Sequence, residues 1–209
     1  MARGTPSKDV GSNLKHAGAA PGIQLLRERL AARRPLALRD APATRRAAVL
    51  VPIVGSDDDL TLLLFQRTHA VLEHKGEICF PGGSIEAEDR NVTDAALREA
   101  NEELGLQRAD VTLLGQLDDV HTIASSYIIT PVVGHLTRMP ELICDPLEVE
   151  RPVIVSLREL TAPGACGTQW LEWGGVSRLR YYYDVAGGRI WGATARMLHE
   201  LLEVWFGAR

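Results

Sequence analysis

The sequence lacks the features that several classes of protein require. It has only three cysteines, at Cys79, Cys144 and Cys166, and no two of them stand at a short spacing. An odd number of widely separated cysteines argues against a disulfide framework and against a zinc knuckle. No apolar run approaches the roughly 20 residues of a membrane-spanning helix, and the first residues lack the apolar segment of a secretory signal. We therefore expect a cytoplasmic protein with no membrane partner.

The sequence also lacks a surplus of positive charge. It has 23 Lys and Arg against 27 Asp and Glu, which gives a formal net charge of −4. Binding to a nucleic acid backbone requires a basic stripe, and none is present, so we expect no nucleic acid partner. No phosphate loop of the Gly-x-x-x-x-Gly-Lys type and no Ser-His-Asp arrangement is found either. The mechanisms that depend on those motifs are set aside.

Length and composition fit one ordinary globular domain. Of the 209 residues, 45% are hydrophobic, which is enough to form a core. Residues 1–22 are rich in Gly, Ala, Ser and Lys and show no periodicity. Such a segment cannot bury enough apolar surface to become ordered. We predict a disordered N-terminal tail over residues 1–22 and a single domain over residues 23–209.

Hydrophobic periodicity predicts a mixture of strands and helices. Helical spacing is found over residues 23–34 and 193–206. Strands are expected at 47–54, 60–67, 112–118, 127–136 and 152–160, the last followed by a turn, and two short strands flank the Ala-Gly-Gly turn within 178–192. The first two strands are joined by Gly-Ser-Asp-Asp-Asp and predict a hairpin. This order favours an α/β sandwich over a parallel doubly wound sheet.

The stretch FPGGSIEAEDRNVTDAALREANEELGL, residues 80–106, holds an unusual density of carboxylates between glycines. Three of its residues are suitable helix N-caps: Asn91, Thr93 and Asp94. No Gly or Pro interrupts residues 95–104, and Gly105 is suited to follow the last turn of a helix. The stretch therefore predicts a helix of about three turns.

This helix carries three glutamates, Glu99, Glu102 and Glu103. The second and third follow the first by three and four residues, so the three carboxylates emerge from one face of the helix. Like charges at this spacing repel, and a solvated acidic face is the simplest interpretation. A hard divalent cation such as Mg²⁺ would offset the repulsion, because it is held by carboxylate and carbonyl oxygens. The turn Pro81-Gly82-Gly83 could bring backbone carbonyls to the same place.

The spacing of these residues resembles the signature of the Nudix hydrolase superfamily. Here it reads Gly83, five residues, Asp89, eight residues and then REANEELGL over residues 98–106. The superfamily signature has Glu in place of Asp89 and one residue fewer before the Arg. Both departures resemble the coenzyme A pyrophosphatase-like branch. The resemblance extends over residues 45–204, through segments such as LLLFQRTHAVLEHKGEICFPGG and RIWGATARMLHELL.

The resemblance implies an α/β/α sandwich with a mixed sheet and a metal-dependent pyrophosphatase. In that branch it implies hydrolysis of the pyrophosphate bond in coenzyme A or acyl-CoA, giving 4′-phosphopantetheine, or its acyl form, and adenosine 3′,5′-bisphosphate. Branch members best matched to coenzyme A usually carry an Arg four residues before Gly76, where this chain has Leu72. Action on ADP-ribose, a dinucleotide or a nucleoside triphosphate therefore stays open. A binding or regulatory module that has lost catalysis is a third hypothesis, which the intact glutamates disfavour.

The same resemblance assigns roles to individual residues. The ligands of Mg²⁺ or Mn²⁺ would be Glu99, Glu102 and Glu103, completed by the carbonyl of Gly82 or Gly83. Arg98 would pair with a neighbouring carboxylate and orient it, since a planar guanidinium suits carboxylates at short range. The attacking water would lose its proton to a helix carboxylate such as Glu99 or to the loop acid Glu148. The superfamily does not keep the base at one place, so both stay candidates.

Other residues have two interpretations each. Asp89 could tether the loop to the helix or contact the metal. Arg67 and His74 could bind substrate phosphate, or could form a surface ion pair and serve a structural role. The aromatic residues Trp170, Trp173 and 181–183 are typical of a core, although they could stack an adenine ring. The expected partner is a small-molecule nucleotide, and the resemblance leaves a homodimer possible.

Overall fold

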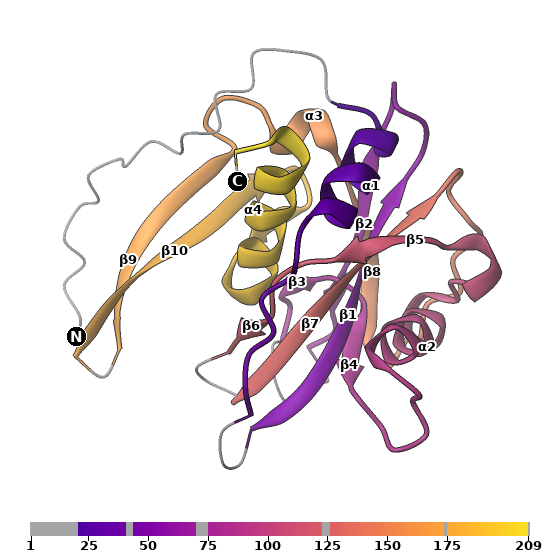
Figure 1. The fold of residues 1–209 in the computed structure, drawn as a ribbon, viewed down its shortest axis with the longest axis horizontal. Coiled ribbons are helices and arrows are strands. Elements are labelled where there is room, and N and C mark those ends of the chain that lie inside the picture. The colour runs from indigo at the N-terminus through magenta and orange to yellow at the C-terminus, as the bar shows by residue number, and fades with distance from the viewer. Residues whose placement is uncertain (1–20, 41–43, 70–74, 123–125, 174, 209) are drawn as a thin grey trace.

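The computed structural model describes residues 21–40, 44–69, 75–122, 126–173 and 175–208 (Figure 1). The helices are α1 (Ile23–Ala32), α2 (Val92–Leu104), α3 (Leu157–Leu160) and α4 (Gly192–Phe206), with a 3-10 turn η1 (Arg108–Asp110). The strands are β1 (Arg45–Val54), β2 (Thr61–Arg67), β3 (Ile78–Cys79), β4 (Gly82–Ser84), β5 (Thr112–Gln116), β6 (Val120–His121), β7 (Tyr127–Leu136), β8 (Val149–Ser156), β9 (Cys166–Trp173), β10 (Val176–Val185) and β11 (Gly188–Ile190). The tail expected over residues 1–22 lies almost wholly outside the described residues, so it stays a prediction.

A mixed sheet of eight strands forms the centre of the fold. Its main path runs β3-β2-β1-β7-β5, while β4 pairs with β1, β6 with β7 and β8 with β2. The strands β1 and β7 are parallel along their whole length, and the other pairings of this sheet are antiparallel. The expected mixed sheet is therefore confirmed.

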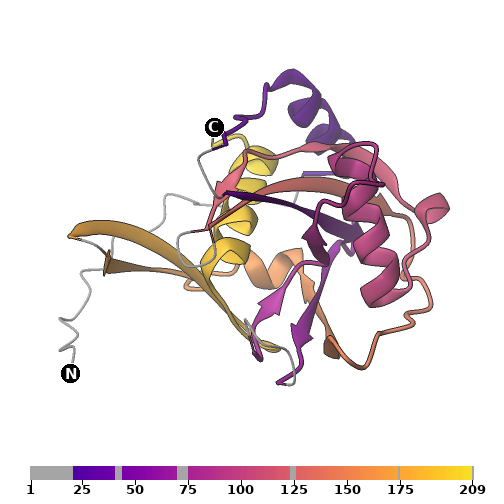
Figure 2. The ribbon, with the colours of Figure 1, turned by 90° about the horizontal axis from the view of Figure 1, so that it is seen from below.

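Helices cover both faces of this sheet, because β1 is apolar on both sides. Val51 and Ile53 of β1 belong to a core cluster shared with α1 and α4. Ala48 and Leu50, which point the other way, belong to a second cluster shared with α2. Figure 2 shows α2 on one side of the sheet and α1 and α4 on the other. A strand buried on both faces is expected to be an almost continuous apolar run, as β1 is, and the α/β/α sandwich is confirmed.

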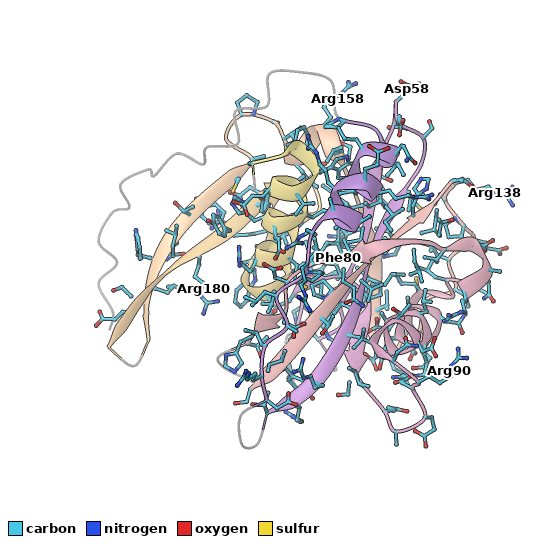
Figure 3. All side chains as sticks on the ribbon, in the orientation of Figure 1. Asp58, Phe80, Arg90, Arg138, Arg158 and Arg180 are labelled. Atoms are coloured by element: carbon cyan, nitrogen blue, oxygen red, sulfur yellow. The ribbon has the colours of Figure 1, made fainter. Side chains whose placement is uncertain are left out.

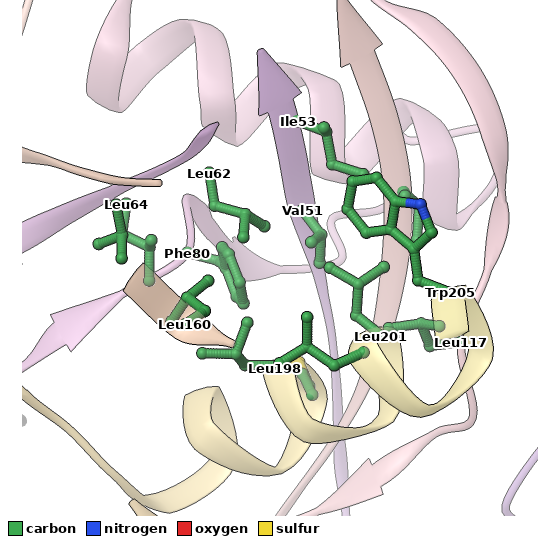
Figure 4. Close-up of a cluster of buried hydrophobic side chains, with 14 of the residues drawn as sticks. Val51, Ile53, Leu62, Leu64, Phe80, Leu117, Leu160, Leu198, Leu201 and Trp205 are labelled. Atoms are coloured by element: carbon green, nitrogen blue, oxygen red, sulfur yellow. The ribbon is translucent and has the colours of Figure 1, made fainter. Parts of the chain in front are cut away.

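The larger core cluster is built around the last helix. Trp205, Leu201 and Leu198 of α4 point toward β1 and β2 and pack with Phe80 from the segment between β3 and β4 (Figure 4). Trp205 is fully buried, and its indole N–H donates to the carbonyl of Pro21 at 2.8 Å. This bond satisfies the polar group of a side chain that otherwise contributes only apolar contacts.

The acidic helix α2 begins earlier than residue 95, at Val92. Asn91 is its N-cap, and the Asn91 side chain accepts a hydrogen bond from the Asp94 N–H at 3.0 Å. At the other end Gly105 has a left-handed φ of 74°, which a glycine adopts without strain. The alanines that face the sheet, Ala95, Ala96 and Ala100, are fully buried. Small side chains let α2 lie close to the sheet that carries β4.

The predicted hairpin of β1 and β2 is confirmed, but it separates after two residue pairs. Only Ile53 and Val54 of β1 pair with Leu62 and Thr61. Further along β1, the short strand β4 takes the place of β2, and Val49 pairs with Gly82. Gly82 and Gly83, which the sequence predicts in a turn with Pro81, are instead residues of β4 and are thereby fixed to the central strand of the sheet. We keep the name diglycine turn for the segment from Pro81 to Gly83.

A three-stranded second sheet, β11-β10-β9, extends from the main body (Figures 1 and 2). The strand β9 was not predicted, β10 is longer than the short strand expected there, and the turn expected after β8 is the short helix α3. The expectation that the aromatic residues form core is correct for Tyr183, which is fully buried, and wrong for Trp170, which is 57% exposed. We call β9 and β10 the arm.

The features that the composition excluded are also missing from the described residues. Cys79, Cys144 and Cys166 are free thiols in this structure. No helix in the described part of the chain has the length and apolar character needed to cross a membrane.

Loss of the α2 cap should destabilise the fold modestly. We expect Asn91→Ala to lower the free energy of unfolding by about 1 kcal/mol, because one backbone N–H of the first turn loses its acceptor. Urea denaturation followed by circular dichroism measures this difference. Arg138→Ala, at an exposed position outside the helices, is the control. An unchanged denaturation midpoint for Asn91→Ala would show that Asn91 does not stabilise α2.

Candidate active site

Two carboxylates of α2 lie directly against the diglycine turn. The N–H of Gly82 donates to Glu103 Oε2 at 2.8 Å. A Cβ atom placed on Gly83 would stand 2.5 Å from the carboxylate carbon of Glu99, a distance that real side chains do not tolerate. Glycine at position 83 therefore leaves the space in which the Glu99 carboxylate lies.

Glu103 is the most buried of the three glutamates. The residue is only 3% exposed, and its nearest cation is Arg67, whose Nη1 lies 3.7 Å from Glu103 Oε1. Burial raises the pKa of the Glu103 carboxyl to about 8, and the Gly82 N–H and Arg67 lower it by smaller amounts. Burial also raises the pKa of Glu99, although Arg98 opposes the change. Without a further cation, these two groups resist ionisation.

Arg98 holds the other carboxylates in place. Its guanidinium donates to both carboxylate oxygens of Asp89 at 3.2 and 3.1 Å, and to Glu99 and Glu102 at 3.0 Å each. It also donates to the carbonyl of Ser84 at 3.0 Å. The hydrogen bonds from Arg98 hold the pKa of Asp89 below its usual value. Arg98 thus contacts carboxylates, as expected, and joins α2 to the loop that follows β4.

Asp89 closes that loop. One of its carboxylate oxygens accepts the N–H of Glu86 at 2.9 Å, in addition to the two bonds from Arg98. Every contact that the structure shows for the Asp89 side chain is therefore a tether within the loop and to the helix. This supports the tethering interpretation over contact with a metal.

Arg67 lies between Glu103 of α2 and a second acidic residue, Glu148. Its Nη2 donates to Glu148 Oε2 at 3.0 Å, and its Nε is shielded from solvent with no acceptor among the described residues. The Glu148 side chain is 43% exposed. Arg67 is thus in an ion pair, and the pair lies inside a cleft, so both interpretations of this residue remain.

A cleft of about 1540 Å³ connects these groups with the arm. At one end it is lined by Gly82, Gly83, Glu99, Glu148 and Arg67. The other end is formed by residues of β9, β10, β11 and the first turn of α4. Most small-molecule pockets have volumes of about 300–1,000 Å³, so the cleft has room for an extended ligand.

Three of the expected site residues adjoin the cleft without lining it. Arg98, Glu102 and Glu103 stand behind or beside the residues of the cleft wall. His74 lies outside the described residues, so its role stays a prediction. Of the cleft residues of the arm, Tyr181 and Tyr182 are among the aromatic residues that could stack an adenine ring, whereas Arg180 was not identified from the sequence. The run RLRYYY, in which two arginines precede three tyrosines, was the only signal for it.

The chemistry of the α2 residues fits a divalent cation. Carboxylate oxygens are the ligands that Mg²⁺ and Mn²⁺ prefer, and the Glu99 and Glu103 carboxylates flank the same glycine turn. Across the described ranges, no three His, Cys, Asp or Glu side chains are gathered closely enough to hold an ion. The positive charge beside these glutamates comes from Arg98 and Arg67.

Comparisons with known proteins agree on one family. Residues 44–161 match the NUDIX domain model. The chain is 34% identical over 159 residues to the Nudix hydrolase NudL of Photorhabdus laumondii, with 76% of this chain and 84% of that protein covered. It is 33% identical over 187 residues to NudL of Klebsiella pneumoniae, with 84% and 90% covered. A MutT/nudix family protein from Enterococcus faecalis has a similar fold, with a TM-score of 0.52, 17% identity and 80% of this chain and 63% of that chain covered.

The raised pKa of Glu103 should make the metal-free protein less stable as pH rises. The unfolded carboxyl loses its proton near pH 4.5 and the folded one near pH 8. Between these values the folded state binds the extra proton, so the free energy of unfolding falls with increasing pH. We expect Glu103→Gln to remove this component and to be more stable than the wild type at pH 8.

Urea denaturation at pH 5, 6.5 and 8 in the presence of EDTA measures the effect. Glu102→Gln is the matched control, because the Glu102 side chain is 57% exposed. If the difference between the wild type and Glu103→Gln is the same at all three pH values, the Glu103 carboxyl does not titrate in this range.

Proposed function

The chain belongs to the Nudix hydrolase family, and we propose that it hydrolyses the diphosphate bond of coenzyme A or of acyl-CoA with Mg²⁺ or Mn²⁺. The observation that supports this most directly is the contact of the Glu99 and Glu103 carboxylates with the Gly82-Gly83 turn at one end of a large cleft. A diphosphate is negatively charged and can join carboxylates only through cations. The cation would therefore bind before or together with the substrate.

The residues that match the Nudix signature would have different roles in the reaction. Glu99, Glu102 and Glu103 would hold the cations, together with the carbonyl of Gly82 or Gly83. When bound, these ions would neutralise charge on the diphosphate and lower the pKa of a water. Arg98 keeps Glu99 and Glu102 in position through bonds of 3.0 Å.

The reaction itself needs a base near the diphosphate. Water attacks one phosphorus atom, one new P–O bond forms, and the bond from that phosphorus to the bridging oxygen breaks. The proton of the water would pass to Glu99 or to Glu148, both of which line the cleft. Arg67 lies between Glu103 and Glu148 and could neutralise substrate phosphate there. The products are 4′-phosphopantetheine, or its acyl form, and adenosine 3′,5′-bisphosphate.

The size of the cleft supports a long substrate. Its 1540 Å³ extend from the acidic end to the aromatic residues of the arm, and coenzyme A combines a nucleotide, a diphosphate and a long pantetheine chain. A second candidate is the same reaction on ADP-ribose, a dinucleotide or a nucleoside triphosphate. Leu72, where the coenzyme A branch usually has an Arg, favours this alternative.

A substrate panel separates the two candidates. With Mg²⁺ or Mn²⁺ present, we expect phosphate-ester products from coenzyme A and acetyl-CoA, because their diphosphate can bridge to the α2 carboxylates. Liquid chromatography of the reaction mixtures identifies the products. If coenzyme A is left intact while ADP-ribose, a dinucleotide or an oxidised nucleoside triphosphate is cleaved, the coenzyme A assignment is wrong.

Neutralising a single carboxylate should stop the reaction. We expect Glu103→Gln and Glu99→Gln each to lower kcat by at least about 100-fold, while the fold is retained, because each would lose an anionic ligand. Glu86→Gln is the matched control, since Glu86 lines the same cleft but its side chain forms no hydrogen bond or ion pair with the described residues of α2. A Glu103→Gln enzyme with wild-type kcat would contradict the site.

A further inference from the structure

The two ends of the cleft differ in charge, and the end formed by the arm holds cations that the proposed reaction does not use. Arg180 of β10 and Arg196 of α4 both line the cleft. Within the described parts of the chain, neither forms an ion pair or a hydrogen bond through its side chain. Arg189 of the same region differs, because it pairs with Asp184 at 2.6 Å and stacks over Tyr182.

Arg180 is the more constrained of the two. Its Nε is shielded from solvent and has no acceptor among the described residues. A shielded N–H without a partner is unfavourable, so such groups are usually completed by water or a ligand. Figure 3 shows Arg180 on the side of the arm that faces the main body. Its neighbour in the cleft wall, Tyr182, offers an aromatic surface.

The first turn of α4 adds to the positive character of this end. Gly192, Ala193 and Thr194 line the cleft, and the N-cap residue Trp191 provides no side-chain acceptor. The free N–H groups and the helix dipole both favour an anion at this position. Glu172 is the one acidic side chain of β9 in the cleft wall, and it pairs with neither arginine.

We propose that Arg180 and Arg196 form a subsite for a second anionic group of the substrate, a phosphate or carboxylate remote from the diphosphate that is cleaved. This inference rests on the proposed function. Guanidinium groups bind planar or tetrahedral oxyanions with paired hydrogen bonds, which suits both chemistries. Coenzyme A carries such a group as its 3′-phosphate, and some acyl-CoA thioesters carry one as a terminal carboxylate.

Two pairs of compounds, each differing by one anionic group, test the subsite. Coenzyme A and dephospho-CoA differ in the 3′-phosphate, and succinyl-CoA and butyryl-CoA differ in a terminal carboxylate. We expect Arg180→Gln and Arg196→Gln each to raise KM about 10-fold for the compound with the extra anionic group in one of these pairs. KM for its partner compound, and kcat for both, should stay unchanged, because the α2 carboxylates are untouched.

The affected pair identifies the source of the anionic group. Arg158→Gln is the control, since Arg158 is exposed on α3 and does not line the cleft (Figure 3). If both arginine variants change KM equally for the two members of each pair, or leave all four KM values unchanged, the subsite does not exist.

Binding without turnover separates this inference from the proposed function. Dissociation constants of the four compounds are measured by calorimetry on Glu99→Gln, with Mg²⁺ present, and again after Arg180→Gln is added. One outcome would support the subsite and contradict the coenzyme A assignment. In it, the wild type cleaves none of the four compounds, and the compound with the extra anionic group binds Glu99→Gln about 10-fold more tightly than its partner. Addition of Arg180→Gln then removes this preference. If Glu99→Gln shows no such preference, the subsite is refuted whatever the wild type cleaves.

Discussion

The burial of like-charged glutamates on one helix is the constraint on which this site depends. Glu99, Glu102 and Glu103 stand on one side of α2, and Glu103 is almost fully buried. Burial raises the pKa of both Glu99 and Glu103, so these two groups resist ionisation without a compensating cation. Arg98 and Arg67 supply part of the positive charge, and the pKa of Glu103, raised to about 8, keeps that carboxyl protonated at neutral pH. The same carboxylates are then available to a divalent ion, whose charge would replace the bound proton.

The sheet determines where this charge is placed. The strand β1 is buried on both faces, and it holds Gly82 and Gly83 in register as residues of β4. The buried alanines of α2 allow the helix to lie close enough for Glu103 to accept the Gly82 N–H and for Glu99 to cover Gly83. A Cβ atom at position 83 would displace the Glu99 carboxylate from this place. The geometry of the candidate site in this Nudix hydrolase is therefore a consequence of core packing.

Local patterns predicted most of the elements but not how far they extend. The helical spacing of residues 23–34 and 193–206 is found in α1, which buries one apolar stripe, and in α4, which is buried on most of its surface. The arm was predicted only in part. Its strand β9, CGTQWLEW, mixes Gly167 with polar and aromatic residues and lacks the apolar run of a core strand, and Trp170 stays exposed. The pairing of β9 with β10 depends on contacts between strands, which no single-strand pattern contains.

The sequence by itself determined that the glutamates share one helix face, that the helix is capped near Asn91 and ends at Gly105, and that the chain resembles Nudix hydrolases. These features depend on spacing within about four residues, which a helix converts directly into neighbouring positions. Only the tertiary structure decided that Glu103 is buried, that Arg67 lies beside it, and that Arg180 shares a cleft with Glu99. Burial and long-range neighbours depend on how distant segments pack, and local spacing does not carry that information.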